Sequence, residues 1–281
     1  MRAPRRAQRE GEPAPFIKWV GGKSRLAAEL LARAPCQFKR YHEPFVGGAA
    51  LFFRLRPTSA LLTDLNADLV DCYRAVKTEV DAVIAALAPH RARHDEAYFY
   101  QTRARWNAAR HELPLAERAA LFVYLNKTCY NGLFRVNRSG EFNVPAGRYT
   151  NPAILDEAGL RAASRALKRV TLAAAPYHAV LDRARAGDFV YFDPPYVPLT
   201  ATANFTSYTA GSFGADEQAR LADVFRRLVK RGCHLLLSNS DTPLVRELYA
   251  GFRIDRVLCA RGVNRDPSKR GAVAEVIVSG A

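Results

Sequence analysis

The strongest candidate for a chemical role in this sequence is the tetrapeptide Asp193-Pro194-Pro195-Tyr196. It directly follows the apolar run 189–192, which predicts a buried strand, and ligands of open α/β sheets bind at the carboxyl ends of strands. The prolines restrict the backbone, so the carbonyl of Pro194 and the carboxylate of Asp193 can face the same donor. Tyr196 adds a face on which a planar ring can stack.

This combination of groups suits an exocyclic amino group on an aromatic ring. Two acceptors can hold its N–H bonds and favour partial pyramidalisation, which returns electron density from the ring to the nitrogen. Acceptors beside a stacking face therefore indicate a site for a nucleobase drawn out of a duplex. The alternative is an ordinary turn after a strand, since Asp and Pro are common turn residues.

A second motif, Glu43-Pro44-Phe45-Val46-Gly47-Gly48, is followed by Asp64. A glycine turn after one strand and an acidic residue after the next are features of dinucleotide-binding sites, although Ala49 interrupts the G-x-G-x-x-G pattern. The Asp64 carboxylate could accept hydrogen bonds from both hydroxyls of a ribose. The motif favours a nucleoside-containing cofactor without a pyrophosphate, and its alternative is a solvent-facing acid in a turn.

Trp19 and Lys23 flank paired glycines and place a stacking ring near a cation. The segment ending Gly22-Lys23-Ser24 resembles a phosphate-binding P-loop, but Ile17 stands where that loop requires its first glycine, so we exclude an ATPase. The alternative for these two side chains is a core Trp and a surface Lys.

Charge and composition limit the classes of function. The 281 residues carry a formal net charge of +15, which attracts polyanions and favours nucleic acid as a partner. No apolar stretch is long enough to span a membrane. The five cysteines are widely spaced, which argues against a disulfide framework or a zinc site and fits a reducing cytoplasm. Residues 1–15 are basic without an apolar segment, and we expect a disordered tail rather than a secretory signal.

The order of the apolar patterns predicts an α/β fold. Strands are expected just before the Glu43–Gly48 motif and near 60–63, 170–174, 188–192, 234–238, 252–258 and 272–278, and helices near 156–167, 177–185, 215–230 and 242–249. Their alternation predicts a mostly parallel, Rossmann-like sheet with helices on both faces.

The block 67–150 interrupts this alternation. It is helical to about residue 125 and then contains the turn 137–140 between two short extended runs, which predicts a β-hairpin. We therefore expect a catalytic domain formed by 16–66 and 151–281, with 67–150 inserted as a helical and hairpin recognition domain.

Taken together, these motifs resemble the Dam-type DNA adenine-N6 methyltransferases, in the α-type motif order. The resemblance covers about residues 16–250. The segments that carry it are Phe16-Ile17-Lys18-Trp19-Val20-Gly21-Gly22-Lys23, the Glu43–Gly48 motif, Asp64-Leu65-Asn66, Leu125-Asn126-Lys127, Tyr130-Asn131-Gly132-Leu133-Phe134-Arg135, Gly140-Glu141-Phe142-Asn143-Val144-Pro145, Asp193-Pro194-Pro195-Tyr196 and Thr200-Ala201-Thr202-Ala203-Asn204-Phe205-Thr206.

The resemblance implies transfer of a methyl group from S-adenosylmethionine to adenine N6 in double-stranded DNA, within GATC. The catalytic residues it implies are Asp193, Pro194, Pro195 and Tyr196. The residues it implies for cofactor binding are Trp19, Lys23, Phe45, Gly47, Asp64 and Asp193. Because a sulfonium methyl is already activated, alignment of nitrogen, carbon and sulfur is the main requirement, without a metal or a covalent intermediate.

The predicted hairpin provides the candidates for DNA recognition. Tyr130 could insert into the base stack, and Arg135 could make a bidentate contact to guanine. The other residues implied in DNA binding are Lys18, Asn131, Leu133, Asn137 and Pro145. Within 126–150 four basic residues oppose one acid, a local excess of positive charge.

Three other interpretations remain open. One is an RNA substrate, although a base-reading hairpin suits the major groove of a DNA duplex better. An N4-cytosine methyltransferase acts on a similar amino group but more often carries Ser at the position of Asp193. A DNA-binding relative without catalysis would not need an intact D-P-P-Y and both cofactor acids. We expect a monomer without an obligate protein partner, acting on the nucleoid in the cytoplasm and not at a membrane.

Overall fold

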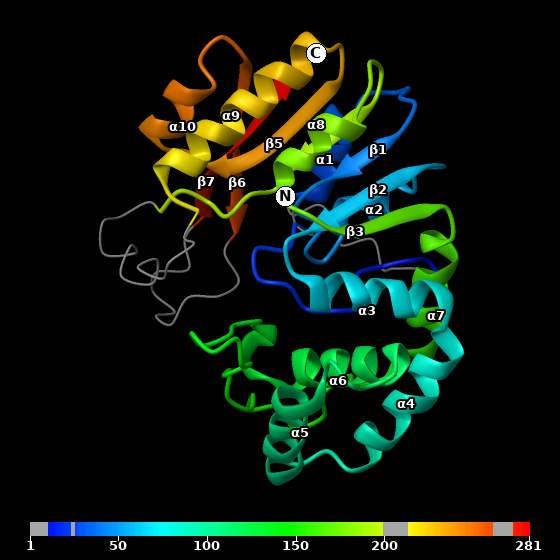
Figure 1. The fold of residues 1–281 in the computed structure, drawn as a ribbon. Coiled ribbons are helices and arrows are strands. Elements are labelled where there is room, and N and C mark those ends of the chain that lie inside the picture. The colour runs from blue at the N-terminus through cyan, green and yellow to red at the C-terminus, as the bar shows by residue number, and fades with distance from the viewer. Residues whose placement is uncertain (1–10, 24–25, 199–212, 261–271) are drawn as a thin grey trace, which may run out of the picture. The chain divides into compact units, whose positions relative to one another are not determined.

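The structure is a computed structural model that describes residues 11–23, 26–198, 213–260 and 272–281 (Figure 1). The chain divides into two compact units. The first takes in the chain up to Gly22, Gly47–Arg56 and Asn66–Leu172, and the second takes in Lys23–Val46, Pro57–Leu65 and the chain from Ala173 onward. The segment 67–150 lies within the first unit. Most of the expected tail and the segment 200–206 lie outside the described residues, although Glu12 pairs with Arg56 at 3.4 Å.

The strands form one mixed sheet in the order β3-β2-β1-β4-β5-β7-β6. The strands are β1 (Tyr41–Glu43), β2 (Ala60–Asp64), β3 (Val170–Ala174), β4 (Phe189–Phe192), β5 (His234–Ser240), β6 (Arg253–Ala260) and β7 (Ala272–Gly280). β1 runs parallel to β2 and to β4, and β4 runs parallel to β5. β7 is antiparallel to both β5 and β6. This arrangement confirms the predicted α/β class with a mostly parallel sheet.

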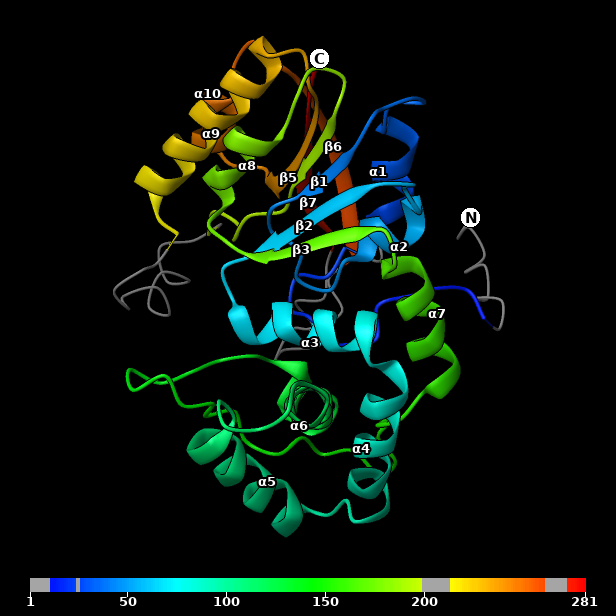
Figure 2. The ribbon, with the colours of Figure 1, turned by 45° about the vertical axis from the view of Figure 1, so that its right-hand side comes forward.

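Helices of the second unit cover both faces of the sheet (Figures 1 and 2). They are α1 (Ala27–Arg33), the 3-10 turn η2 (Tyr177–Ala179), α8 (Val180–Arg183), α9 (Ala215–Lys230) and α10 (Pro243–Leu248). Buried side chains of α8, α9 and α10 form one apolar core with β4, β5 and β7, and Ile254 of β6 packs against it. The next residue, Asp255, faces the opposite side and binds Arg33 of α1 at 2.8 Å, so α1 covers the other face.

The amphipathic pattern of α9 explains why this segment forms a helix against the sheet. Leu221, Phe225 and Leu228 repeat at helical spacing and are fully buried. Acidic residues in the first turn and basic residues in the last turn complement the helix dipole.

The first unit is built around α6 (Leu115–Thr128), whose residues 119–126 are all buried. A helix that is apolar on all sides needs neighbours on all sides, and Figure 2 shows α6 end-on among the other helices of this unit. The remaining elements are α2 (Ala50–Leu55), α3 (Ala67–Thr78), α4 (Val80–Ala92), α5 (Glu96–Ala109), the 3-10 turn η1 (Tyr130–Gly132) and α7 (Glu157–Leu167).

The predicted hairpin differs from expectation in its extent. Its two limbs share a single antiparallel bridge, Val136 with Phe142, and form no ladder. The limbs exchange two backbone hydrogen bonds, from Asn137 N to Glu141 O and from Asn143 N to Arg135 O. Side chains of α5 and of the residue that follows it also hold this segment. The amide of Asn107 donates to Phe142 O at 3.1 Å and accepts from Phe142 N at 2.8 Å, while Arg103 and Arg110 donate to Val144 O and Gly140 O. A helix therefore supplies the partners that a neighbouring strand would otherwise supply.

Candidate active site

The Asp193–Tyr196 segment begins directly at the carboxyl end of β4, where the sequence predicted it. All four residues of β4 are buried, as is typical of a central parallel strand. On one side of β4 the sheet continues through β1, β2 and β3, and on the other through β5. The segment thus lies at the point where the strand order reverses, which is the usual ligand position in open α/β sheets.

The carboxylate of Asp193 is held by two donors. Lys23 Nζ lies 2.7 Å from Asp193 Oδ1, and Ser238 Oγ donates to the same oxygen at 3.0 Å. Tyr191 OH lies 2.8 Å from Ser238 Oγ and can donate to it, which fixes the serine hydroxyl. Both contacts fall on Oδ1, so Oδ2 can still accept an incoming N–H.

Opposing effects act on the pKa of Asp193. Burial raises the pKa above its ordinary value, while the ammonium of Lys23 and the Ser238 hydroxyl lower it. Burial is the largest of these effects. Lys23 is itself buried, with 9% of its surface exposed, so its charge acts on Asp193 with little screening. This excludes a simple surface role for Lys23.

Tyr196 is fixed beside the same cation. Lys23 Nζ lies 4.4 Å from the centre of its ring, and its hydroxyl donates to Glu275 Oε2 at 3.0 Å. Burial raises the pKa of the Tyr196 phenol well above its ordinary value. The phenol is therefore a neutral donor near pH 7, and the ring orientation is set from β7.

The backbone that follows Asp193 is held by amide side chains. Gln218 of α9 donates to Pro195 O at 2.8 Å, and Asn239 of β5 accepts from Val197 N at 3.1 Å. Asn239 also donates to Gln218 at 3.1 Å. This network and the two prolines make the turn rigid before any ligand binds.

Sequence reasoning missed the residues that support this turn. Ser238 and Asn239 carried a usable signal, because polar residues directly follow the apolar run of β5 just as Asp193 follows the run of β4. Gln218 and Glu275 carried none, because only the tertiary fold brings α9 and β7 to this point.

Phe45 and Asp64 lie at the carboxyl ends of neighbouring strands. Phe45 follows β1 and stacks on Tyr177, with ring centroids 5.4 Å apart. Asp64 ends β2 and is partly buried, and the next residue, Leu65, is 79% exposed. Because β1, β2 and β4 are parallel, these residues share an edge of the sheet with Asp193.

Trp19 and Gly47 lie together in the first unit. Gly47 has a φ of +43°, and a Cβ on it would stand 2.6 Å from Trp19 Cδ1. Tyr73 OH donates to Gly47 O at 2.9 Å. The glycine is therefore needed both for its backbone conformation and for the close approach of the indole ring, and Trp19 is half-buried rather than part of a core.

Lys18 is engaged within the protein. Its Nζ donates to Lys127 O at 3.0 Å and lies 3.9 Å from the centre of the Tyr149 ring. A contact from this ammonium to DNA would require the side chain to exchange these partners.

Most residues expected to contact DNA are accessible at the turn after α6. Tyr130 is 49% exposed, and Arg135 is exposed while its Nε donates to Asn143 Oδ1 at 2.7 Å. Asn137 closes the 137–141 turn, since its side chain accepts from Glu141 N at 2.9 Å. The remaining residues of this set are Asn131 and Pro145, which are exposed, and Leu133, which is half-buried.

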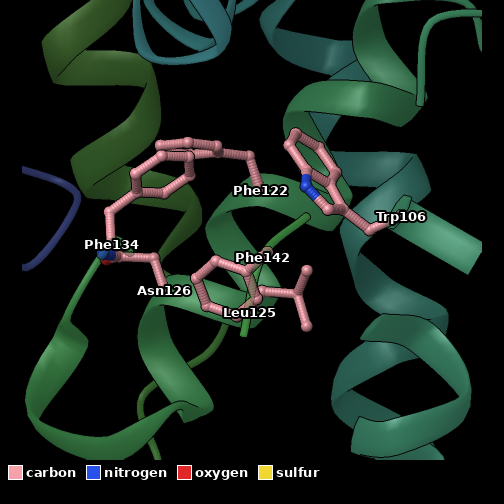
Figure 3. Close-up of a pocket in the computed structure, with 6 residues that line it drawn as sticks. All are labelled: Trp106, Phe122, Leu125, Asn126, Phe134 and Phe142. Atoms are coloured by element: carbon pink, nitrogen blue, oxygen red, sulfur yellow. The ribbon is translucent and has the colours of Figure 1, made fainter. Parts of the chain in front are cut away.

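An aromatic cluster anchors this turn to the helices (Figure 3). A small apolar pocket is lined by Trp106, Phe122, Leu125, Asn126, Phe134 and Phe142. Phe134 packs on Phe122 with ring centroids 5.4 Å apart, and on Phe142 at 5.7 Å. Both limbs of the turn thus insert a ring into the helical part of the first unit, which leaves the polar side chains outside.

The described residues bring together a carboxylate paired with a lysine, an aromatic ring for stacking and a turn held by hydrogen bonds. They form no metal centre. No group of three or more His, Cys, Asp or Glu side chains among them could hold a metal ion. No helix in the described part is long and apolar enough to cross a bilayer. The assembled groups can accept hydrogen bonds from an amino group and stack on a planar ring.

Comparison with known proteins connects these features to a family. Residues 19–258 match the model of the D12 class N6 adenine-specific DNA methyltransferases. The chain is 42% identical to the type II methyltransferase M.MjaIII of Methanocaldococcus jannaschii, over 92% of this chain and 96% of that protein. It is 38% identical to the type II methyltransferase M1.LlaDCHI of Lactococcus lactis subsp. cremoris, over 94% of each chain.

The chain is also 37% identical to the DNA adenine methylase of Escherichia coli K12, over 93% of each chain. Among solved structures, a precorrin 8W decarboxylase of Methanobacterium thermoautotrophicum aligns at 12% identity and a TM-score of 0.36, over 92% of this chain and 89% of that one. That degree of structural similarity supports no conclusion about this chain.

Proposed function

Because this chain belongs to the D12 class of N6 adenine-specific DNA methyltransferases, we propose that it transfers a methyl group from S-adenosylmethionine to N6 of an adenine drawn out of duplex DNA, within GATC. The observation that carries this proposal is the Asp193 turn. A carboxylate, a stacking ring and a fixed backbone meet at the end of β4, and an adenine presents an amino group on a planar ring to such a site.

The residues present fit a nucleoside cofactor. Asp64 offers a carboxylate at a strand end for ribose hydroxyls, and the exposed Leu65 and half-buried Phe45 offer apolar surface for a base on the same edge of the sheet. In the first unit, Trp19 against Gly47 offers a second aromatic contact. When bound, S-adenosylmethionine would supply a methyl group already activated by its sulfonium charge.

Asp193 would act as an orienting acceptor for the amino group. An N–H bound to Oδ2, with a second bound to Pro194 O, places the nitrogen lone pair out of the ring plane and available for attack. Tyr196 would stack on the adenine. Lys23 would hold Asp193 in its charged form against the effect of burial, and the released proton can leave after transfer.

DNA recognition is assigned to the first unit. Tyr130 would fill the space that the adenine vacates, and Arg135 would bind guanine O6 and N7. Lys18, Asn131, Leu133, Asn137 and Pro145 would provide the neighbouring contacts. We propose that the protein carries out this methyl transfer as a monomer, on chromosomal DNA in the cytoplasm.

The decisive experiment incubates plasmid DNA with the protein and tritiated S-adenosylmethionine and maps the modified base by sequencing. N6-methyladenine in GATC is the expected product. N4-methylcytosine would support the cytosine reading, and methylation outside GATC would overturn the target assignment.

A pair of variants tests whether Asp193 takes part in catalysis. Asp193→Ala should lower kcat by about 100-fold or more, because a preorganised acceptor is lost, and should keep DNA binding. Asp241→Ala is the matched control: it also follows a strand of the sheet, but it pairs with Arg246 at 2.7 Å, outside the Asp193 network. Retained turnover by Asp193→Ala would remove Asp193 from the catalytic role.

A further inference from the structure

Asn126 connects two segments that have different proposed tasks. It lies near the end of α6 with 3% of its surface exposed. On one side it contacts Lys18, within the segment assigned to the cofactor. On the other it contacts Gly132, within the turn assigned to DNA. All three residues belong to the first unit.

The contacts of Asn126 use both donors of its amide and one acceptor position of its oxygen. Its Oδ1 accepts from Lys18 N at 2.7 Å, and its Nδ2 donates to Lys18 O at 2.7 Å. The same Nδ2 donates to Gly132 O at 3.2 Å. The side chain thus pairs with the backbone of Lys18 as a neighbouring strand would, and it also holds the first turn of the recognition segment.

The two segments are also packed against each other directly. Gly132 has a φ of +65°, and a Cβ on it would stand 2.3 Å from Lys18 Cβ. A second contact lies close by on both segments, since the rings of Trp19 and Phe134 are stacked, with centroids 6.1 Å apart and an interplanar angle of 20°. Trp19 in turn lies against Gly47. The backbone from Lys18 to Trp19 therefore cannot shift without displacing Gly132 or Phe134.

We propose that Asn126 is a positioning residue that couples cofactor binding to target recognition. The inference rests on the proposed function, because it takes Trp19 as a cofactor contact and Tyr130–Arg135 as the DNA contact. A cofactor that restricts the motion of Trp19 would also restrict the backbone of Lys18. Through the hydrogen bonds of Asn126, this restriction would extend to Gly132 and the turn that follows. Such coupling is reciprocal, so DNA would strengthen cofactor binding by the same factor.

The test first establishes that the wild-type protein methylates its duplex, so that a failure of the proposed function is recognised separately. It then measures the Kd of that duplex by fluorescence anisotropy, with and without saturating S-adenosylhomocysteine. We expect about tenfold tighter DNA binding with this cofactor product, within the usual range for coupled sites. An active wild-type protein with a ratio of one would overturn the proposal.

Asn126→Asp removes the donor and keeps the shape. The carboxylate can still accept from Lys18 N, but it cannot donate to Lys18 O or Gly132 O. We expect the ratio between the two Kd values to fall from about ten to near one. A ratio equal to that of the wild type would overturn the proposal.

Asn107→Asp is the matched control. Asn107 also holds backbone of the recognition segment through paired hydrogen bonds, to Phe142 N and O, and neither bond involves Lys18 or Trp19. It should weaken DNA binding equally with and without S-adenosylhomocysteine, so the ratio stays near the wild-type value. If the ratio between the two Kd values falls to near one in both variants, general loosening of the turn, and not the loss of the Asn126 contacts, explains the fall. That result would overturn the proposal.

A measurement on the wild-type protein keeps the proposal testable if Asn126→Asp does not fold. Hydrogen exchange in the absence of DNA would compare the amides of Lys18 and Leu133 with and without S-adenosylhomocysteine. Slower exchange at both amides is expected. Protection at Lys18 without protection at Leu133 would show that order does not pass to the turn, and would overturn the proposal.

Discussion

At the scale of single residues, the contact between Lys23 and Asp193 sets the charge of the candidate site. The carboxylate is buried, and burial raises its pKa more than any other effect. A protonated Asp193 would have one oxygen less to offer as an acceptor. The ammonium 2.7 Å away therefore determines the pH range over which the site can accept N–H bonds.

Lys23→Gln should move the acidic limb of the activity profile to higher pH. Lys23 lowers the pKa of Asp193, so removing its charge lets that pKa rise, and Asp193 becomes protonated at a pH where the wild type is still ionised. The measurement is kcat against pH for both proteins. Arg246→Gln, which removes a cation from Asp241 instead, is the control. A midpoint that stays unchanged or moves to lower pH in Lys23→Gln would contradict this assignment.

Arg135→Ala should relax discrimination at one guanine of the target. Its guanidinium is exposed and oriented by Asn143, and a bidentate contact to guanine contributes about 1–3 kcal/mol of discrimination. The measurement is kcat/KM on a set of duplexes with single substitutions in the target. Arg138→Ala, at an exposed position of the same turn, should keep the wild-type order of preference. The same order in Arg135→Ala would exclude Arg135 from base recognition.

At the scale of elements, the short turn η1 determines how the recognition segment leaves α6. Asn131 and Gly132 both have positive φ, +54° and +65°, which reverses the chain within three residues. Tyr130 N donates to Pro145 O at 2.9 Å, so the start and end of the recognition segment are tied together. The exposed side chains are thus carried on a closed loop whose interior is aromatic.

Gly132→Ala should destabilise the protein more than Gly140→Ala. Both glycines have positive φ, so each substitution costs about 1 kcal/mol in backbone strain. A Cβ at Gly132 would also overlap Lys18, whereas nothing lies within 4 Å of a Cβ at Gly140. We expect about 1–3 kcal/mol of additional loss at Gly132, measured as the free energy of unfolding in urea. Equal losses would show that the contact with Lys18 is not tightly packed.

At the scale of the whole molecule, the net charge of +15 remains the simplest signature of a polyanionic substrate. Many of the arginines in the described residues are engaged in ion pairs or bind backbone carbonyls, as Arg118 does with Asp71 and Arg103 with Val144. The excess positive charge therefore acts mainly through the long-range electrostatic field of the protein. We expect this field to attract DNA through its phosphates.

DNA affinity should fall steeply as salt increases. Six or more phosphate contacts would lower the association constant by about 1,000-fold between 50 and 200 mM salt. The measurement is the slope of the logarithm of the association constant against the logarithm of the salt concentration, for the duplex that the protein methylates. Binding of S-adenosylhomocysteine, measured by calorimetry over the same range, is the control and should change little. A slope near zero for DNA would contradict phosphate-dominated binding.

The sequence by itself determined the class of fold and the family. Apolar runs followed at once by Asp64 and Asp193 are local patterns, and strand ends in a parallel sheet share an edge, so their position could be predicted without coordinates. The alternation of strands and helices likewise follows from local periodicity.

Only the tertiary structure decided what surrounds those residues. Lys23, Ser238 and Glu275 are far apart in sequence yet converge on Asp193 and Tyr196. Local patterns also overestimated the hairpin, because side chains of α5, and not only the first limb, supply partners for its second limb. Hydrogen bonds and ion pairs between distant segments depend on how helices and strands pack, and no local pattern in the sequence records which side chains then meet.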